Sequence, residues 1–125
     1  MYKIVGVGVD LCAVSRMESA VLKDHFIHRV FTEGERAYIA AQGKCAAQSA
    51  AACFAAKEAA AKALATGFSA GIMPAQIELL HEESGAPSLA FHGAAKERLC
   101  ALGASRAHVS LSHEGDLAMA FVVLE

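Results

Sequence analysis

Three charged residues stand in an otherwise uncharged, alanine-rich stretch of this 125-residue chain: Lys57, Glu58 and Lys62. A carboxylate held away from water needs a cation, and Mg²⁺ is usually bound by one or two carboxylates together with substrate phosphates and water. Ammonium groups beside such a metal can neutralise phosphate. The three residues could therefore form a metal and phosphate site. Alternatively, Glu58 and Lys62 could form only an ion pair between successive helical turns, worth about 0.3–0.5 kcal/mol.

The stretch from Ala46 to Ala65 must position these side chains, and it favours a helix because it contains neither Pro nor Gly. A helix of about 20 residues is about 30 Å long. Its flanking turns are apolar on all sides, which predicts a helix buried over most of its surface. Glu58 and Lys62 fall on one face. Lys57 and Lys62 are about 140° apart around the axis, so we do not expect them to hold one phosphate oxygen together.

A second acidic residue, Asp10, follows the β-branched run from Ile4 to Val9, which contains Gly6 and Gly8. This run predicts a buried strand approached closely at its glycines, and Asp10 is expected to end it. Asp10 could be a second metal ligand, or a turn or helix-cap residue. A dinucleotide-binding fingerprint of the usual form is excluded, because Leu11 stands where its third glycine would be.

The remaining segments predict one α+β domain over residues 1–125, with a small antiparallel sheet packed against the long helix and shorter helices. Capping boxes open two of these helices, one at Ser15 with Glu18 and one at Thr32 with Glu35. We expect the short helices at 15–22, 32–42 and 94–102. We expect a loop at 67–74, and strands paired as hairpins at 76–82 with 88–92 and at 108–112 with 117–124.

Composition narrows the class of protein. The chain is 55% hydrophobic and 19% charged, with a net charge of −2, which excludes a disordered or polybasic chain and predicts no nucleic-acid partner. No apolar run reaches the about 18 residues that would predict a membrane span. The N-terminal residues do not resemble a signal peptide, and the four cysteines form no C-x-x-C pair, so a cytoplasmic protein with free thiols is expected. A buried central helix in so small a domain also predicts oligomerisation.

The motifs of the chain, taken in order, resemble the holo-acyl-carrier-protein synthase family of 4′-phosphopantetheinyl transferases. The resemblance keeps order and spacing over nearly the whole chain. Its most specific part is Asp10 together with Phe-x-x-Lys-Glu-x-x-x-Lys at 54–62, which favours the metal-site interpretation over the cap and ion-pair interpretations. The stretches that carry it are 6–10 with Arg16, 26–35, 54–64, 85–87 and 108–113.

The resemblance implies transfer of the 4′-phosphopantetheine arm of coenzyme A to a serine of apo-acyl carrier protein, with release of adenosine 3′,5′-bisphosphate, in fatty acid biosynthesis. It also implies dependence on Mg²⁺ and a homotrimer whose active sites lie between adjacent subunits. Asp10 and Glu58 are the expected metal ligands. Lys62 is the preferred phosphate ligand, and Lys57 is a second candidate.

The serine that is modified belongs to the partner, so this chain must supply a path for the serine proton. Glu58 or a metal-bound water is the first candidate for the base. His113 is the second candidate, as a base or as a ligand of the nucleotide phosphates, and it could also be a plain surface histidine. The resemblance further implies coenzyme A contacts at Gly67 and Pro87.

Arg16 and Arg29 match family positions at which the acidic carrier protein docks. Complementary charge there would raise the association rate and set the register of docking. From charge alone, the same residues would be interpreted as an ordinary solvated face.

The sequence departs from the family pattern at Cys53, where Arg is usual, at Leu64, where Phe is usual, and at Ala65, where Gly is usual. Loss of a guanidinium at position 53 is expected to remove a contact with phosphate or carboxylate. The metal pair is intact, so an active enzyme is predicted. Three alternatives stay open: a non-catalytic carrier-protein-binding module, another metal-dependent phosphotransferase acting on a nucleotide diphosphate, and a structural subunit.

Overall fold

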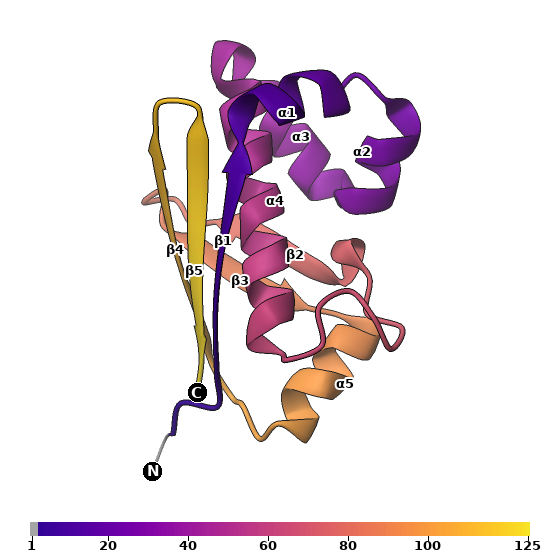
Figure 1. Ribbon diagram of the computed structural model, residues 1–125, viewed down its shortest axis with the longest axis vertical. Coiled ribbons are helices and arrows are strands. Elements are labelled where there is room, and N and C mark those ends of the chain that lie inside the picture. The colour runs from indigo at the N-terminus through magenta and orange to yellow at the C-terminus, as the bar shows by residue number, and fades with distance from the viewer. Residues whose placement is uncertain (1–2) are drawn as a thin grey trace.

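The computed structural model describes residues 3–125 and has the predicted α+β class (Figure 1). The N-terminal elements are β1 (Gly6–Ala13), α1 (Val14–Ala20), α2 (Asp24–Val30), α3 (Glu33–Ala41) and the 3₁₀ turn η1 (Gly43–Cys45). The central helix is α4 (Ala46–Ala63). The C-terminal elements are the 3₁₀ turn η2 (Pro74–Gln76), β2 (Ile77–His81), β3 (Pro87–Phe91), α5 (Gly93–Ala101), β4 (Ala107–Glu114) and β5 (Leu117–Leu124). No helix within residues 3–125 is long and apolar enough to cross a membrane.

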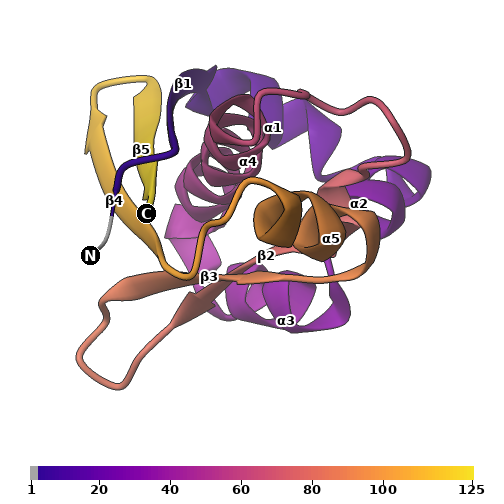
Figure 2. The ribbon, with the colours of Figure 1, turned by 90° about the horizontal axis from the view of Figure 1, so that it is seen from below.

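Helix α4 runs through the middle of the molecule, with a three-stranded sheet on one side and α1 and α2 on the other (Figure 2). Between Ala50 and Leu64 every residue of this segment is buried except Ala52, Glu58 and Lys62. The alanine-rich sequence thus gives a helix that other elements surround. Two of the three exceptions are residues singled out for their chemistry.

The two glycines of β1 allow the strand to contact α4 through its backbone. A Cβ atom on Gly6 would collide with the carbonyl oxygen of Ala63, and one on Gly8 would collide with that of Ala59. The prediction of a close approach at the glycines is therefore confirmed. The neighbour is the helix backbone, which the small alanine side chains leave accessible.

The three-stranded sheet has the order β1-β5-β4 and is antiparallel throughout, and β2 and β3 form a separate hairpin. Asp10 pairs with Ala120 in the middle of β1, and the strand continues to Ala13, which pairs with Leu117. The expectation that Asp10 ends the strand is therefore wrong. The strand continues because β5 offers eight residues for pairing, and a carboxylate on the face toward α4 does not interrupt the ladder.

Local capping signals predict one helix start correctly and one incorrectly. At α3, Thr32 and Glu35 form the expected capping box: the Glu35 amide donates to Thr32 Oγ1, and the Thr32 amide donates to Glu35 Oε1. At α1 the expected box at Ser15 is absent. The Ser15 amide and hydroxyl instead donate to the Asp116 carboxylate at 2.9 and 2.7 Å. A residue far along the chain thus replaces the local cap.

The remaining predictions hold within one or two residues for α5 and the two hairpins, and the loop after α4 is present. Helix α2 was not predicted. It is short and has no side-chain cap, and Val30 is its buried residue.

Candidate active site

Asp10 on β1 and Lys62 on α4 form an ion pair that connects the strand to the helix. Lys62 Nζ lies 3.0 Å from Asp10 Oδ1 and also donates to the carbonyl oxygen of Val9 at 3.0 Å. The Asp10 side chain is 18% exposed and the Lys62 side chain is 53% exposed. In the described part of the chain, Lys62 therefore pairs across to β1 and not with Glu58 of its own helix. The simple helical ion pair considered from the sequence is not formed.

Glu58 lies half-buried on α4, one turn before Lys62. Burial raises the pKa of Glu58, and the negative charge of Asp10 raises it further, whereas Lys62 and Arg16 lower it. The two carboxylates therefore act on each other electrostatically, although one comes from a strand and the other from a helix. Such a pair attracts a cation.

The donor set fits Mg²⁺, because two carboxylates on neighbouring elements influence each other electrostatically. Within residues 3–125 no group of three or more His, Cys, Asp or Glu side chains is placed to hold a metal. Two carboxylates would therefore need substrate phosphates and water to complete the coordination shell. This is the usual way in which proteins hold Mg²⁺.

Lys57 is adjacent to Glu58 in sequence but points into the interior. Its side chain is fully buried, and its ammonium contacts Glu35 Oε1 at 2.7 Å and the carbonyl oxygens of Pro74 and Ile77 at 2.9 and 2.6 Å. An ammonium has three N–H donors, and here all three have acceptors. This geometry contradicts the phosphate role considered for Lys57. The angular separation from Lys62 that the sequence predicts agrees with this placement.

The sequence predicts Glu35 only as a capping residue and does not predict that it is the buried partner of Lys57. Its Oε2 accepts the Leu79 amide at 2.8 Å and the Cys53 thiol at 3.2 Å. The available signal was a lysine in a buried stretch of helix, since a buried ammonium requires a carboxylate nearby.

Cys53 is itself buried, and burial raises the pKa of its thiol well above the ordinary value. It packs against Glu35 and not against Asp10 or Glu58. The departure from the family pattern at this position therefore lies in the interior network with Glu35, and the predicted loss of a phosphate contact stays a prediction.

A cavity of about 390 Å³ opens on another side of Glu58. Arg16 and Arg29 both line it, so the structure brings the two expected docking residues together beside the carboxylate. The Arg16 guanidinium lies 5.2 Å from the centre of the Phe54 ring. The walls are otherwise mostly apolar and include Phe26, Phe54, Phe68, Ile72, Met73 and Pro74.

His113 lies on β4, two strands from Asp10, and is exposed. It lines a hollow of about 220 Å³, and a second hollow of about 400 Å³ is lined by Asp10 and Lys62. The two hollows share Leu11 and Met119, so they are neighbours on the molecule. His113 is therefore near the carboxylate site but is not in contact with it.

The two residues expected to contact coenzyme A lie on other segments. Gly67 is in the loop after α4 with φ of 60°, a conformation that favours glycine. Pro87 begins β3 opposite His81, in the hairpin sheet and not in the sheet that carries Asp10. Their predicted contacts stay predictions.

Comparisons with known proteins establish the family. The model of the 4′-phosphopantetheinyl transferase superfamily matches residues 6–122, and this chain belongs to that superfamily. Holo-[acyl-carrier-protein] synthase of Halorhodospira halophila is 47% identical over 123 residues, which cover 97% of each chain. The enzyme of the same name from Solidesulfovibrio magneticus is 45% identical over 124 residues, which cover 98% of each chain.

Solved structures agree with this assignment. The holo-[acyl-carrier-protein] synthase of Neisseria meningitidis superposes with a TM-score of 0.86 at 34% identity, over 98% of this chain and 99% of that one. The Bacillus anthracis holo-(acyl-carrier-protein) synthase, solved in complex with CoA (3′,5′-ADP), gives 0.80 at 33% identity over 97% and 96%. The Helicobacter pylori enzyme in complex with coenzyme A gives 0.80 at 27% identity over 95% and 99%.

Proposed function

We propose that this protein is a holo-acyl-carrier-protein synthase, which transfers the 4′-phosphopantetheine arm of coenzyme A to a serine of apo-acyl carrier protein in fatty acid biosynthesis. Family membership and similarity over nearly the full length support this proposal. The structural observation that carries it is the pair of interacting carboxylates, Asp10 and Glu58, with the ammonium of Lys62 beside them.

Asp10 and Glu58 would hold Mg²⁺ in this proposal. Bound Mg²⁺ supplies charge neutralisation and Lewis acidity at the coenzyme A pyrophosphate. Lys62 is the side chain best suited to bind a phosphate oxygen, because half of its surface is exposed and its stem is flexible. Lys57 is not included, since its donors are occupied in the interior.

The transfer forms a bond between phosphorus and the serine oxygen and breaks the pyrophosphate bond, so adenosine 3′,5′-bisphosphate leaves and the serine must lose a proton. Glu58 is our first candidate to accept that proton within this chain. Burial and the Asp10 charge raise its pKa, which makes its carboxylate a stronger base. His113 stays the second candidate, because its hollow adjoins the carboxylate site.

We propose that carrier protein docks at the cavity lined by Arg16 and Arg29. The two guanidinium groups offer positive charge to an acidic partner, and the apolar walls offer a surface that a partner can bury. Glu58 lies in the same cavity, so a serine that enters there would meet the proposed base.

We propose a homotrimer in which the outer face of the three-stranded sheet is covered by a neighbouring subunit. This face, opposite α4, carries a row of exposed large apolar side chains, and such a patch marks an interaction surface. Its members are Val7, Val9, Leu11, Leu117, Met119 and Phe121, between 37% and 59% exposed. Leu11 and Met119 also line both hollows near Asp10 and His113, so a subunit packed here would add residues to the site.

We also place the protein in the cytoplasm. The four cysteines are free thiols, which suits a reducing compartment.

The experiment that tests the function is the intact mass of a purified apo-acyl carrier protein after incubation with this protein, coenzyme A and Mg²⁺, with and without a chelator. We expect a gain of one phosphopantetheine arm that the chelator abolishes. No gain from a folded protein that binds coenzyme A would contradict the proposal. Release of nucleotide without any carrier protein would favour another phosphotransferase.

A further inference from the structure

The Lys62 ammonium occupies a position at which two oxygen ligands converge. Its Nζ is 3.0 Å from Asp10 Oδ1 and 3.0 Å from the carbonyl oxygen of Val9. Oxygens of these two kinds are what hard divalent cations prefer. The positively charged ammonium of Lys62 is therefore paired with the carboxylate to which the proposed Mg²⁺ would bind.

The contact between Lys62 and Asp10 can be exchanged. The Lys62 side chain is 53% exposed, and ion pairs with an exposed partner are weak. The lysine stem is flexible, so the ammonium can leave Asp10 without any movement of α4. The hollow of about 400 Å³ that Lys62 lines gives the ammonium space next to the carboxylate.

The two carboxylates need a positive charge whether or not a metal is bound. Lys62 Nζ lies 3.0 Å from Asp10 Oδ1, and Lys62 follows Glu58 by one turn of α4, so its positive charge lies near both carboxylates. Without Lys62, a strand carboxylate and a helix carboxylate would face each other with less compensation.

We propose that the Lys62 ammonium pairs with Asp10 when no metal is bound, and that it leaves this carboxylate when a divalent cation binds. Lys62 then becomes free to meet phosphate, so cation binding and phosphate binding strengthen each other. By linkage, phosphate must favour cation binding to the same extent. This inference rests on the proposed metal site and adds a sequence of events: the metal binds first, and its binding releases the lysine that then binds phosphate.

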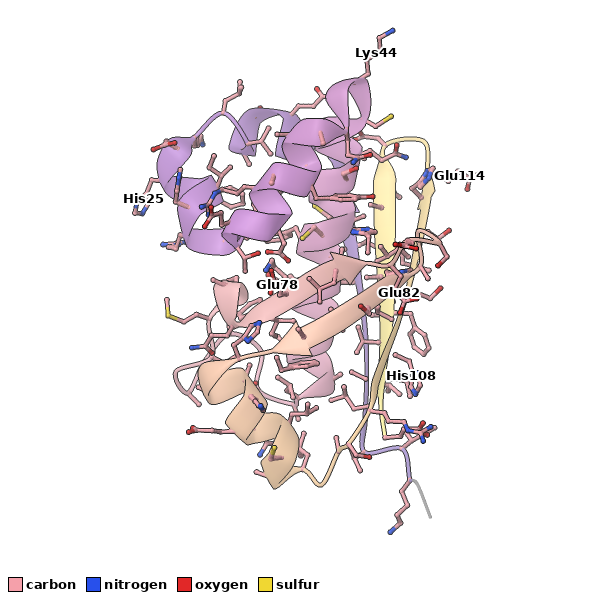
Figure 3. All side chains as sticks on the ribbon, turned by 180° about the vertical axis from the view of Figure 1, so that it is seen from behind. His25, Lys44, Glu78, Glu82, His108 and Glu114 are labelled. Carbon is pink, nitrogen blue, oxygen red and sulfur yellow. The ribbon has the colours of Figure 1, made fainter. Side chains whose placement is uncertain are left out.

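The first test is the affinity for Mn²⁺ alone, measured by electron paramagnetic resonance titration. Lys62→Met should bind Mn²⁺ about fivefold to tenfold more tightly than wild type, because a competing charge is removed from the site. The matched control is Lys44→Met, which removes the same charge from an exposed residue that points away from the molecule (Figure 3). It should change the affinity by less than about twofold. Asp10→Asn should lose most of the binding.

The second test separates displacement from a simple loss of repulsion. Wild-type protein is treated with an amine-acetylating reagent with and without saturating Mg²⁺, and each lysine is quantified by mass spectrometry. Labelling of Lys62 should rise by about twofold or more with Mg²⁺, because the ammonium is no longer held by Asp10. Lys44 should label equally in both conditions, and Lys57 should stay protected.

Unchanged Lys62 labelling in a protein that binds Mn²⁺ through Asp10 would overturn this inference and leave the metal site standing. Unchanged or weaker Mn²⁺ affinity in Lys62→Met would also overturn it. If wild type binds no Mn²⁺, or if Asp10→Asn binds as well as wild type, the metal assignment fails and the inference fails with it.

Discussion

Helix α4 carries two lysines in ion pairs, and the two pairs differ in burial. The pair of Lys57 and Glu35 is 2.7 Å long, with side chains 0% and 1% exposed. The pair of Lys62 and Asp10 is 3.0 Å long, with side chains 53% and 18% exposed. From the sequence, Lys62 is the preferred phosphate ligand and Lys57 is a second candidate. Only the exposed one keeps donors that a substrate can reach.

The difference shows how burial decides the role of a charge. A buried pair is tolerated only when further hydrogen bonds satisfy it, and Lys57 meets this condition with two carbonyl oxygens from η2 and β2. That network joins α3, α4 and the hairpin and has no donor to spare. The exposed pair is weak and open to exchange, as a ligand site requires.

The largest expected effect is a loss of activity at Glu58, the carboxylate one helical turn from Lys62 of the more exposed pair. Glu58→Ala should lower transfer to carrier protein by about a thousandfold or more, because it removes a metal ligand and the proposed base together. Its circular dichroism spectrum should match wild type, since the Glu58 side chain is only half-buried. The measurement is the initial rate of phosphopantetheine transfer with Mg²⁺. A rate within tenfold of wild type would remove Glu58 from the site.

The next effect compares how much the Lys57–Glu35 pair and the Lys62–Asp10 pair each contribute to the free energy of unfolding. Lys57→Met should lower the free energy of unfolding by about 3–5 kcal/mol, because it leaves the Glu35 carboxylate buried without a cation. Lys62→Met should cost less than about 1 kcal/mol. Urea unfolding followed by circular dichroism measures both.

The double variant Glu35→Gln with Lys57→Met is the control for that experiment. It should recover part of the loss, because no unpaired charge remains. If Lys57→Met instead unfolds like wild type and loses only transfer, Lys57 belongs to the chemistry and the comparison between the pairs is wrong.

The turn that ends α4 directly after Lys62 has a strained backbone. The chain leaves the helix through Ala65, whose φ is 63°, and the Ala65 amide donates to the Lys62 carbonyl at 2.9 Å. This conformation disfavours residues with a Cβ atom. Ala65→Gly should therefore raise the free energy of unfolding by about 1 kcal/mol in urea titrations. A loss of stability would mean that the Ala65 side chain contributes packing at this turn.

The smallest effect is the contribution of Glu58 to the pH dependence of stability. The folded state raises the pKa of Glu58, so between the ordinary and the raised pKa the folded protein binds more protons than the unfolded chain. Stability therefore falls as pH rises through this window. Glu58→Gln should remove this cost and be more stable than wild type at pH 7 by less than about 1 kcal/mol. Thermal unfolding should show the difference vanish near about pH 4. A constant difference across pH would assign the effect to packing.

Predictions from the sequence succeeded where the signals are local. The alanine-rich run, the capping box of Thr32 and Glu35, and the turns of the two hairpins each depend on residues a few positions apart. The assignment of Asp10, Glu58 and Lys62 to the site rests on a spaced motif and stays a prediction. Within this site, the structure adds the pairing of Lys62 with Asp10.

The predictions failed where a distant residue decides the outcome. Ser15 looks like a helix cap, but Asp116 from the β4–β5 turn supplies the hydrogen bonds. Lys57 looks like a phosphate ligand because its partner, Glu35, lies on another helix and already had a local role. Helix α2 was missed because its seven residues lack a side-chain cap. The partners of Ser15 and Lys57 are 101 and 22 residues away in the sequence, so no local spacing identifies them.

The contact between the glycines of β1 and the carbonyl oxygens of Ala59 and Ala63 also sets the spacing of the two carboxylates. Asp10 lies two residues after Gly8 on the strand, and Glu58 directly precedes Ala59 on the helix. The contact between the two main chains therefore fixes the distance between the Asp10 and Glu58 backbones. Repacking of side chains elsewhere in the core should leave this distance unchanged. A methyl group added at Gly8 would push β1 away from α4 and increase the distance between the two carboxylates. A redesign of this enzyme should therefore keep Gly6 and Gly8 together with Asp10 and Glu58, the proposed metal ligands.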